Sequence, residues 1–230
     1  GKAKSNSLVY IYDADTNKAH WVTYDKNLDS WTKSYLGENP KAPQKLNATP
    51  LFSKYNSKFT YATTADLREL PLPTIQFLRD STAGNQRYLK IRISPNRKVN
   101  RYDIFANEKM TITNFKANGA QNLEQKGASL PRRGLKIVSY YVVANEPLEM
   151  EFSIDRSNVF DMQLLESSFD LMQNLLFSMQ KREDWMMPTP FILNDAVVIK
   201  QRIKPSPQVI PTMQPKKASR IIKVDSLKVE

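Results

Sequence analysis

The chain has 230 residues and a formal net charge of +11, with 40% hydrophobic and 10% aromatic residues, no cysteine and one histidine. This apolar content suffices for a packed core and excludes wholesale disorder. The lack of cysteine excludes disulfides and thiolate nucleophiles, and one histidine cannot supply the ligands of a usual catalytic zinc. No apolar run approaches the roughly 20 residues that cross a bilayer. The Gly1-Lys2 start predicts an internal fragment of a longer protein.

The N-terminal part predicts a hairpin. Two β-branched and aromatic runs, 8–12 and 19–24, flank the turn-rich stretch 13–18. Residues 25–50 are loop-like, punctuated by three prolines. One short helix is expected at 29–36, capped by Asp29 or Ser30 and ended at Gly37.

The middle of the chain predicts strands. Residues 89–93 and 148–155 alternate strictly between apolar and polar side chains, which is typical of half-buried antiparallel strands. Residues 158–182 mix strand and helix spacing, and we interpret them as a strand at 159–166 followed by an irregular or partly helical connection. Further strands are expected at 99–106, 110–115, 135–143 and 196–203.

About ten short strands with few short helices predict an all-β fold, an antiparallel β-sandwich or jelly roll. We expect residues 1–204 to form this β-sandwich domain. Residues 205–230 are expected to form a basic, proline-rich C-terminal tail that ends in a strand-like run at 220–224.

The positive charge is concentrated in two segments. Residues 200–230 and 87–101 each carry a net charge of +6, so the other 184 residues sum to −1. Both segments are candidate contact surfaces for anionic lipid or an acidic partner, and the segment 87–101 forms a basic cluster. Nucleic acid is not expected, because the apolar residues between these cations fit a core better than a stacking surface. This basic cluster consists of Arg87, Lys90, Arg92, Arg97, Lys98 and Arg101.

Catalytic and metal motifs are weak. Asp13, Asp15 and Asn17 match the start of a calcium loop, but Lys18 and Tyr24 occupy its glycine and glutamate positions, which favours a plain hairpin turn. His20 lies in a strand pattern with no nucleophile elbow in the chain, so a packed or surface histidine is favoured over a general base.

Glu149 and Glu151 fall two apart on one strand. Ion pairs with Lys90, Arg92 or Arg101 across a sheet are favoured over the carboxylate pair of a glycosidase. We therefore assign no catalytic residue, no metal ligand and no cofactor to this fragment.

An aromatic group near the N-terminus consists of Trp21, Tyr24, Trp31 and Tyr35. Such rings fill one end of a sandwich core or stack on a sugar or peptide. The second alternative makes this group a candidate ligand or interaction surface.

Four strings resemble one family. They are Lys18–Gly37, Leu89–Arg97, Val138–Phe152 and Met187–Ala196. They are similar to a region of bacterial membrane-anchored zinc peptidases, which belong with the di-zinc aminopeptidases and resemble the vacuolar membrane protease and the endoplasmic-reticulum metallopeptidase. In that family the region follows the transmembrane helices, and none of the metal-binding motifs of the peptidase domain maps onto this sequence.

The resemblance implies an extracytoplasmic, C-terminal, non-catalytic accessory domain. The parent would be membrane-anchored and would carry zinc in a separate peptidase domain, and its peptidase and membrane regions would be this domain's partners. The expected role is to pack on the catalytic domain or to present substrate to it. The alternative is a carbohydrate- or peptide-binding β-sandwich module that uses the aromatic group.

Overall fold

The protein is all-β. The computed structural model describes residues 2–48, 50–52, 58–121, 127 and 129–207. Strands dominate the described residues, and the two helices are short. The elements in chain order are β1 (Lys4–Asn6), β2 (Val9–Asp13), β3 (Lys18–Thr23), α1 (Ser30–Leu36), α2 (Gln44–Ala48), a 3-10 turn (Pro50–Phe52), β4 (Tyr61–Ala65), β5 (Thr74–Ala83), β6 (Gln86–Ser94), β7 (Arg101–Ala106), β8 (Ile112–Ala117), β9 (Lys136–Tyr141), β10 (Leu148–Asp155), β11 (Met162–Ser168), β12 (Met186–Pro188) and β13 (Ala196–Arg202).

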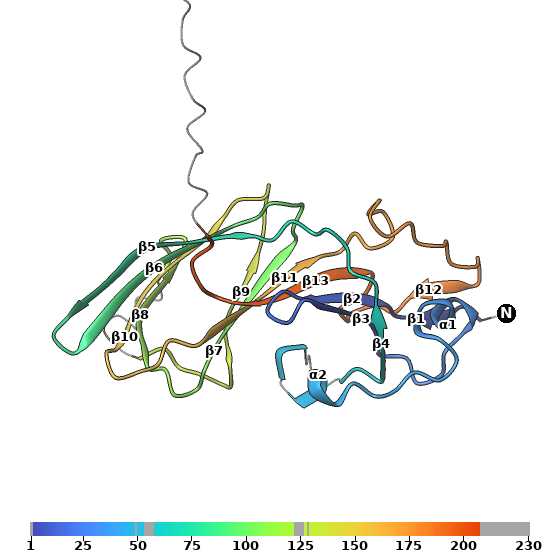
Figure 1. Ribbon diagram of the computed structural model, residues 1–230, viewed down its shortest axis with the longest axis horizontal. Helices are drawn as coiled ribbons and strands as arrows, with labels where there is room; N and C mark the ends of the chain where they lie inside the picture. Colours follow the sequence, from blue (N-terminus) through green and yellow to red (C-terminus); the bar gives the residue numbers. More distant parts are fainter. Residues whose placement is uncertain (1, 49, 53–57, 122–126, 128, 208–230) are drawn as a thin grey trace, which may run out of the picture.

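The strands form three sheets. A seven-stranded sheet has the order β4-β3-β2-β13-β11-β7-β9, and a four-stranded antiparallel sheet has the order β5-β6-β10-β8. β1 and β12 pair in parallel as a small third sheet. Figure 1 shows an elongated molecule, with the four-stranded sheet at one end and α1 with the small sheet at the other. The seven-stranded sheet connects the two ends.

One end of the molecule is a β-sandwich. The four-stranded sheet packs its alternating apolar side chains against β7 and β11 of the larger sheet. Leu89, Ile91 and Ile93 of β6 are buried, as are the matching apolar residues of β10. This confirms the predicted alternation and the predicted sandwich.

The other end of the large sheet is covered on both faces. Tyr10 and Trp21 face α1 and the segment 169–186, whereas Val9 and Val22 face the 3-10 turn and Phe59. β2 and β13 pair in parallel here, so both strands are buried on both faces and lack the polar alternation of β6.

The predicted helix and hairpin are present. Asp29 accepts a hydrogen bond from the Thr32 amide at 2.9 Å, and Gly37 follows the last turn at φ 80°. β2 and β3 form the expected hairpin. The segment 169–182 forms turns rather than a regular helix, and Ser178 has φ 47°, which no right-handed helix accommodates.

The sequence pattern missed four strands. β1 and β12 have three residues each, which is too short for a periodic signal. β4 is a polar edge strand, and seven of the ten residues of β5 are exposed. Near the C-terminal end of the described chain, Ser206 donates its amide to the Ile75 carbonyl at 2.8 Å, and residues 208–230 lie outside the described residues.

A buried ion pair lies where the two halves of the large sheet meet. Glu166 of β11 is fully buried, and Arg97 donates to its Oε1 at 2.8 Å while the Tyr102 hydroxyl donates to its Oε2 at 2.7 Å. The Arg97 guanidinium also donates to the Ser168 hydroxyl and the Val197 carbonyl. Burial raises the pKa of the Glu166 carboxyl, and the Arg97 charge opposes that rise.

We expect Arg97→Met to destabilise the fold by about 3–5 kcal/mol, because it leaves the Glu166 carboxylate buried without a counter-charge. The exposed pair Arg87–Asp80 provides the control, since Arg87→Met should cost under about 1 kcal/mol. Urea unfolding of both variants measures the difference. Equal losses of unfolding free energy in the two variants would contradict this assignment.

Candidate functional site

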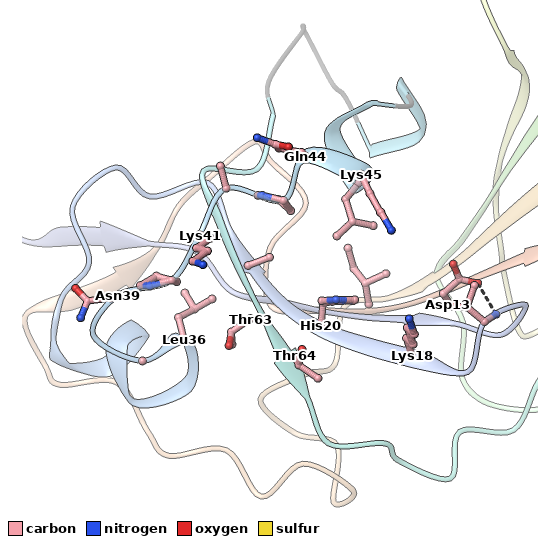
Figure 2. A pocket seen from close by; sticks show the side chains of 18 residues that line it. Asp13, Lys18, His20, Leu36, Asn39, Lys41, Gln44, Lys45, Thr63 and Thr64 are labelled. Atoms are coloured by element: carbon pink, nitrogen blue, oxygen red, sulfur yellow. Dashed lines mark hydrogen bonds between the residues drawn. The ribbon is translucent and has the colours of Figure 1, made fainter.

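A groove of about 1010 Å³ opens beside β4 (Figure 2). β2, β3 and β4 form its floor, and α2 with the loop from Gly37 to Pro43 forms its wall. The lining residues are Ile11, Asp13, Thr16, Lys18, His20, Leu36, Gly37, Asn39, Pro40, Lys41, Ala42, Pro43, Gln44, Lys45, Leu46, Ala62, Thr63 and Thr64.

Strand register determines which side chains reach the floor. His20 is directly opposite Ile11 on one side and Thr64 on the other, so these three side chains share one face of the sheet. Ile11 is 1% exposed, whereas His20 is partly exposed. Near Val22, this face of the sheet is covered by the core residues around Phe59. The groove begins beside His20, where this core ends.

The wall is attached to β4 at one point. The Ala62 amide donates to the Lys41 carbonyl at 2.9 Å, which forms an isolated antiparallel bridge. The next loop residue that would face β4 is Asn39, opposite Thr64. Within the described residues the loop and β4 share this single bridge, and Thr63 and Thr64 line the groove beyond it.

The groove is positively charged. Lys18, Lys41 and Lys45 are exposed, and none of them enters an ion pair within the described part of the chain. The single lining acid, Asp13, is already engaged: Lys200 lies 3.4 Å from its Oδ2, and the Asp15 amide donates to its Oδ1 at 3.0 Å. Figure 2 shows Lys18 and His20 side by side on β3, with Lys45 on α2 across from them.

His20 is the chain's single histidine and lies among these cations. Partial burial lowers its pKa below the ordinary value, Lys18 lowers it further, and Asp13 opposes the shift. The imidazole is therefore neutral at neutral pH, where it can both donate and accept a hydrogen bond. The described lining residues include three threonine hydroxyls, but no thiol and no set of metal ligands.

The predicted aromatic group does not form a ligand platform. Trp21 and Trp31 are 8% and 5% exposed, and their rings pack with Tyr35 in the core beneath α1. Trp31 donates its indole N–H to the Gln180 carbonyl, so its polar atom is used internally. Tyr24 lies on the opposite face of the sheet against Phe59, and burial raises its pKa to about 12. The core interpretation of these rings therefore holds.

The predicted basic cluster is largely neutralised. Lys90 and Arg92 both bind the Glu149 carboxylate, at 3.1 and 2.9 Å, which confirms the cross-strand pairing expected from the sequence. The hydrogen bond from Lys90, followed by that from Arg92, lowers the pKa of Glu149. The remaining pairs are Arg87–Asp80, Arg97–Glu166 and Arg101–Asp103, whereas Lys98 is exposed.

The calcium-like stretch forms the turn of the β2–β3 hairpin. The Asp13 carboxylate accepts from the Asp15 and Thr16 amides, and Asp15 accepts from the Arg202 amide of β13. The described residues contain no group of three or more His, Cys, Asp or Glu side chains placed to hold a metal ion. No described helix is long and apolar enough to span a bilayer.

Sequence reasoning missed the groove because neither its wall nor the strand β4 of its floor has a recognisable sequence pattern. The wall is a proline-punctuated loop, and the edge strand β4 is too short and too polar to predict. The available signals were the unbalanced lysines at positions 18, 41 and 45 and the lone histidine at position 20.

We expect Lys18→Gln to raise the pKa of His20 and Asp13→Asn to lower it, because the first removes a repelling cation and the second an attracting anion. Proton NMR titration measures this directly, since the chain has one imidazole. Lys98→Gln, which removes a charge outside the groove lining, is the control. If Lys18→Gln and Asp13→Asn changed the His20 pKa no more than the control does, these two charges would not act on the groove.

No family model and no curated protein matches the chain.

Proposed function

We propose that this chain is a non-catalytic accessory domain that binds polypeptide in the groove beside β4. The parent proposed is a membrane-anchored protein of the zinc aminopeptidase type, with this domain on the non-cytoplasmic side. The domain would hold a peptide segment, either of its own catalytic domain or of a substrate, and present it to that domain. Zinc would belong to the peptidase domain, and this chain's partners would be the parent's peptidase and membrane regions.

The groove is the observation that supports binding. It has about 1010 Å³ of space beside an edge strand, and the three lysines that line it are exposed and form no ion pair with another described residue. Edge strands can bind an extended peptide through main-chain hydrogen bonds. The basic cluster at 87–101 is not used in this proposal, since five of its six cations are occupied by internal ion pairs.

The resemblance supports the choice of parent. The string Lys18–Gly37 supplies β3 and α1, and four of its residues line the groove. The carbohydrate alternative loses its basis, because the tryptophans that would stack on a sugar are core residues. Peptide binding remains part of the proposal, but in the groove rather than at the aromatic group.

We expect extended peptides of about ten residues to bind the chain and shift the NMR amide signals of β3, β4 and α2. Ala42→Trp should weaken binding roughly tenfold or more, because the indole would occupy the groove. Asn85→Trp, at the exposed tip of the β5–β6 hairpin, is the matched control. Equal affinities of these two variants would place binding outside the groove.

Two further results would overturn the proposal. The first is cleavage of the peptide by this chain, with or without added Zn²⁺, as followed by mass spectrometry. The second concerns the parent: the gene's reading frame upstream of Lys2 should encode membrane helices and a zinc-peptidase domain. A frame that encodes neither would remove the assigned parent while leaving peptide binding to be measured on its own.

A further inference from the structure

The outer edge of β4 has a specific main-chain orientation. The Ala62 amide donates away from β3, to Lys41, and in a strand the residue two positions on has the same orientation. Thr64 therefore directs its amide and carbonyl away from β3 as well, at a position that lines the groove. A second strand placed there could exchange two hydrogen bonds with Thr64.

The charge on the groove wall selects among possible strands. Lys18, Lys41 and Lys45 come from β3, from the loop and from the start of α2, and all three line the same groove as Thr64. They are exposed, and Asp13, the one acid in the lining, is already paired with Lys200. An incoming chain with carboxylates would meet cations that have no ion pair to give up among the described residues.

The lining also favours a peptide over a nucleic acid. Its described residues include no phenylalanine, tyrosine or tryptophan, so the His20 imidazole is the one described ring on which a base could stack. Ala42, which is exposed, and Leu46, which is partly exposed, provide small aliphatic surfaces suited to side chains of an extended peptide. The chain's own residues 208–230 carry five Lys/Arg and two acids, which makes them a poor match in charge.

We propose that the groove selects acidic peptides in an extended conformation, which add to the edge of β4 at Thr64 while their carboxylates meet the three lysines. This inference rests on the proposed peptide binding and specifies its ligand class. Side chains on one face of such a peptide repeat every second residue, roughly 7 Å apart. Alternating Glu and Val is therefore the simplest ligand pattern.

The first experiment compares three labelled ten-residue peptides by fluorescence anisotropy: alternating Glu-Val, alternating Gln-Val and alternating Lys-Val. We expect the Glu peptide to bind at least tenfold more tightly than the Gln peptide, and its affinity to fall as salt is raised. Equal affinities of the Glu and Gln peptides would overturn the selectivity while the proposed peptide binding stands. Failure of all three peptides to bind would overturn both.

Charge variants locate the effect. The triple change Lys18→Gln, Lys41→Gln and Lys45→Gln should abolish the preference for Glu over Gln. The matched control changes three exposed lysines outside the groove lining, Lys98, Lys109 and Lys204, to Gln and carries the same net charge. Equal loss of preference in the two triple variants would overturn the assignment to the groove, because only overall charge would then matter.

The main-chain part has its own test. In the Glu-Val peptide, N-methylation of single amides should weaken binding at one position of the bound segment, the residue opposite Thr64, because the Ala62 amide is already bonded to Lys41. Uniform effects along the peptide would overturn strand addition. A single-stranded oligonucleotide of equal charge serves as the last probe. The choice of a peptide would be overturned if the oligonucleotide bound as tightly as the Glu peptide and lost this binding in the groove triple variant.

Discussion

The pairing of Arg97 with Glu166 is the interaction on which the arrangement of this molecule depends. Glu166 belongs to β11, which lies between β13 and β7, where the sandwich half of the large sheet meets the half that bears the groove. Its neighbours across the strand are Tyr102, in the sandwich core, and Ile199, in the core beneath α1. A charge at this point is buried between two apolar clusters, and its hydrogen bonds join them.

The network works because nearly every polar atom in it has a partner. Both Glu166 oxygens accept hydrogen bonds, and Arg97 also reaches Ser168 and two backbone carbonyls. The loop that carries Arg97 is itself fixed, since Asn145 donates to the Arg97 carbonyl and accepts from the Val99 amide. A half-satisfied version of this network would cost more than an apolar core at the same place. Its completeness explains how one continuous sheet can have two separate cores on the same face.

The sequence predicted those parts of the fold whose signals are local. Alternation identified β6 and β10, and the Asp29 and Gly37 signals identified α1, because each pattern reports burial or capping within a few residues. The burial of Trp21 and the ion pair of Arg97 could not be predicted from neighbouring residues in the sequence. Trp21 is buried by residues 150 positions away, and the partner of Arg97 lies on a strand 69 positions later. The groove escaped prediction for the same reason, since the loop reaches β4 through a bridge at Ala62 and α2 is held to Phe59 by the Asn47 side chain.

The parallel pairing of β2 with β13 has a consequence for the order of events during synthesis. Val9 is opposite Ala196, so the hairpin that forms the groove floor depends on a strand made almost at the end of the described chain. On the ribosome the hairpin emerges first and must wait for nearly two hundred residues before that neighbour exists. Contacts of such long sequence separation slow folding and leave early strands exposed. The groove-bearing half of the molecule therefore becomes complete only after β13 is made, although β2 and β3 are made long before it.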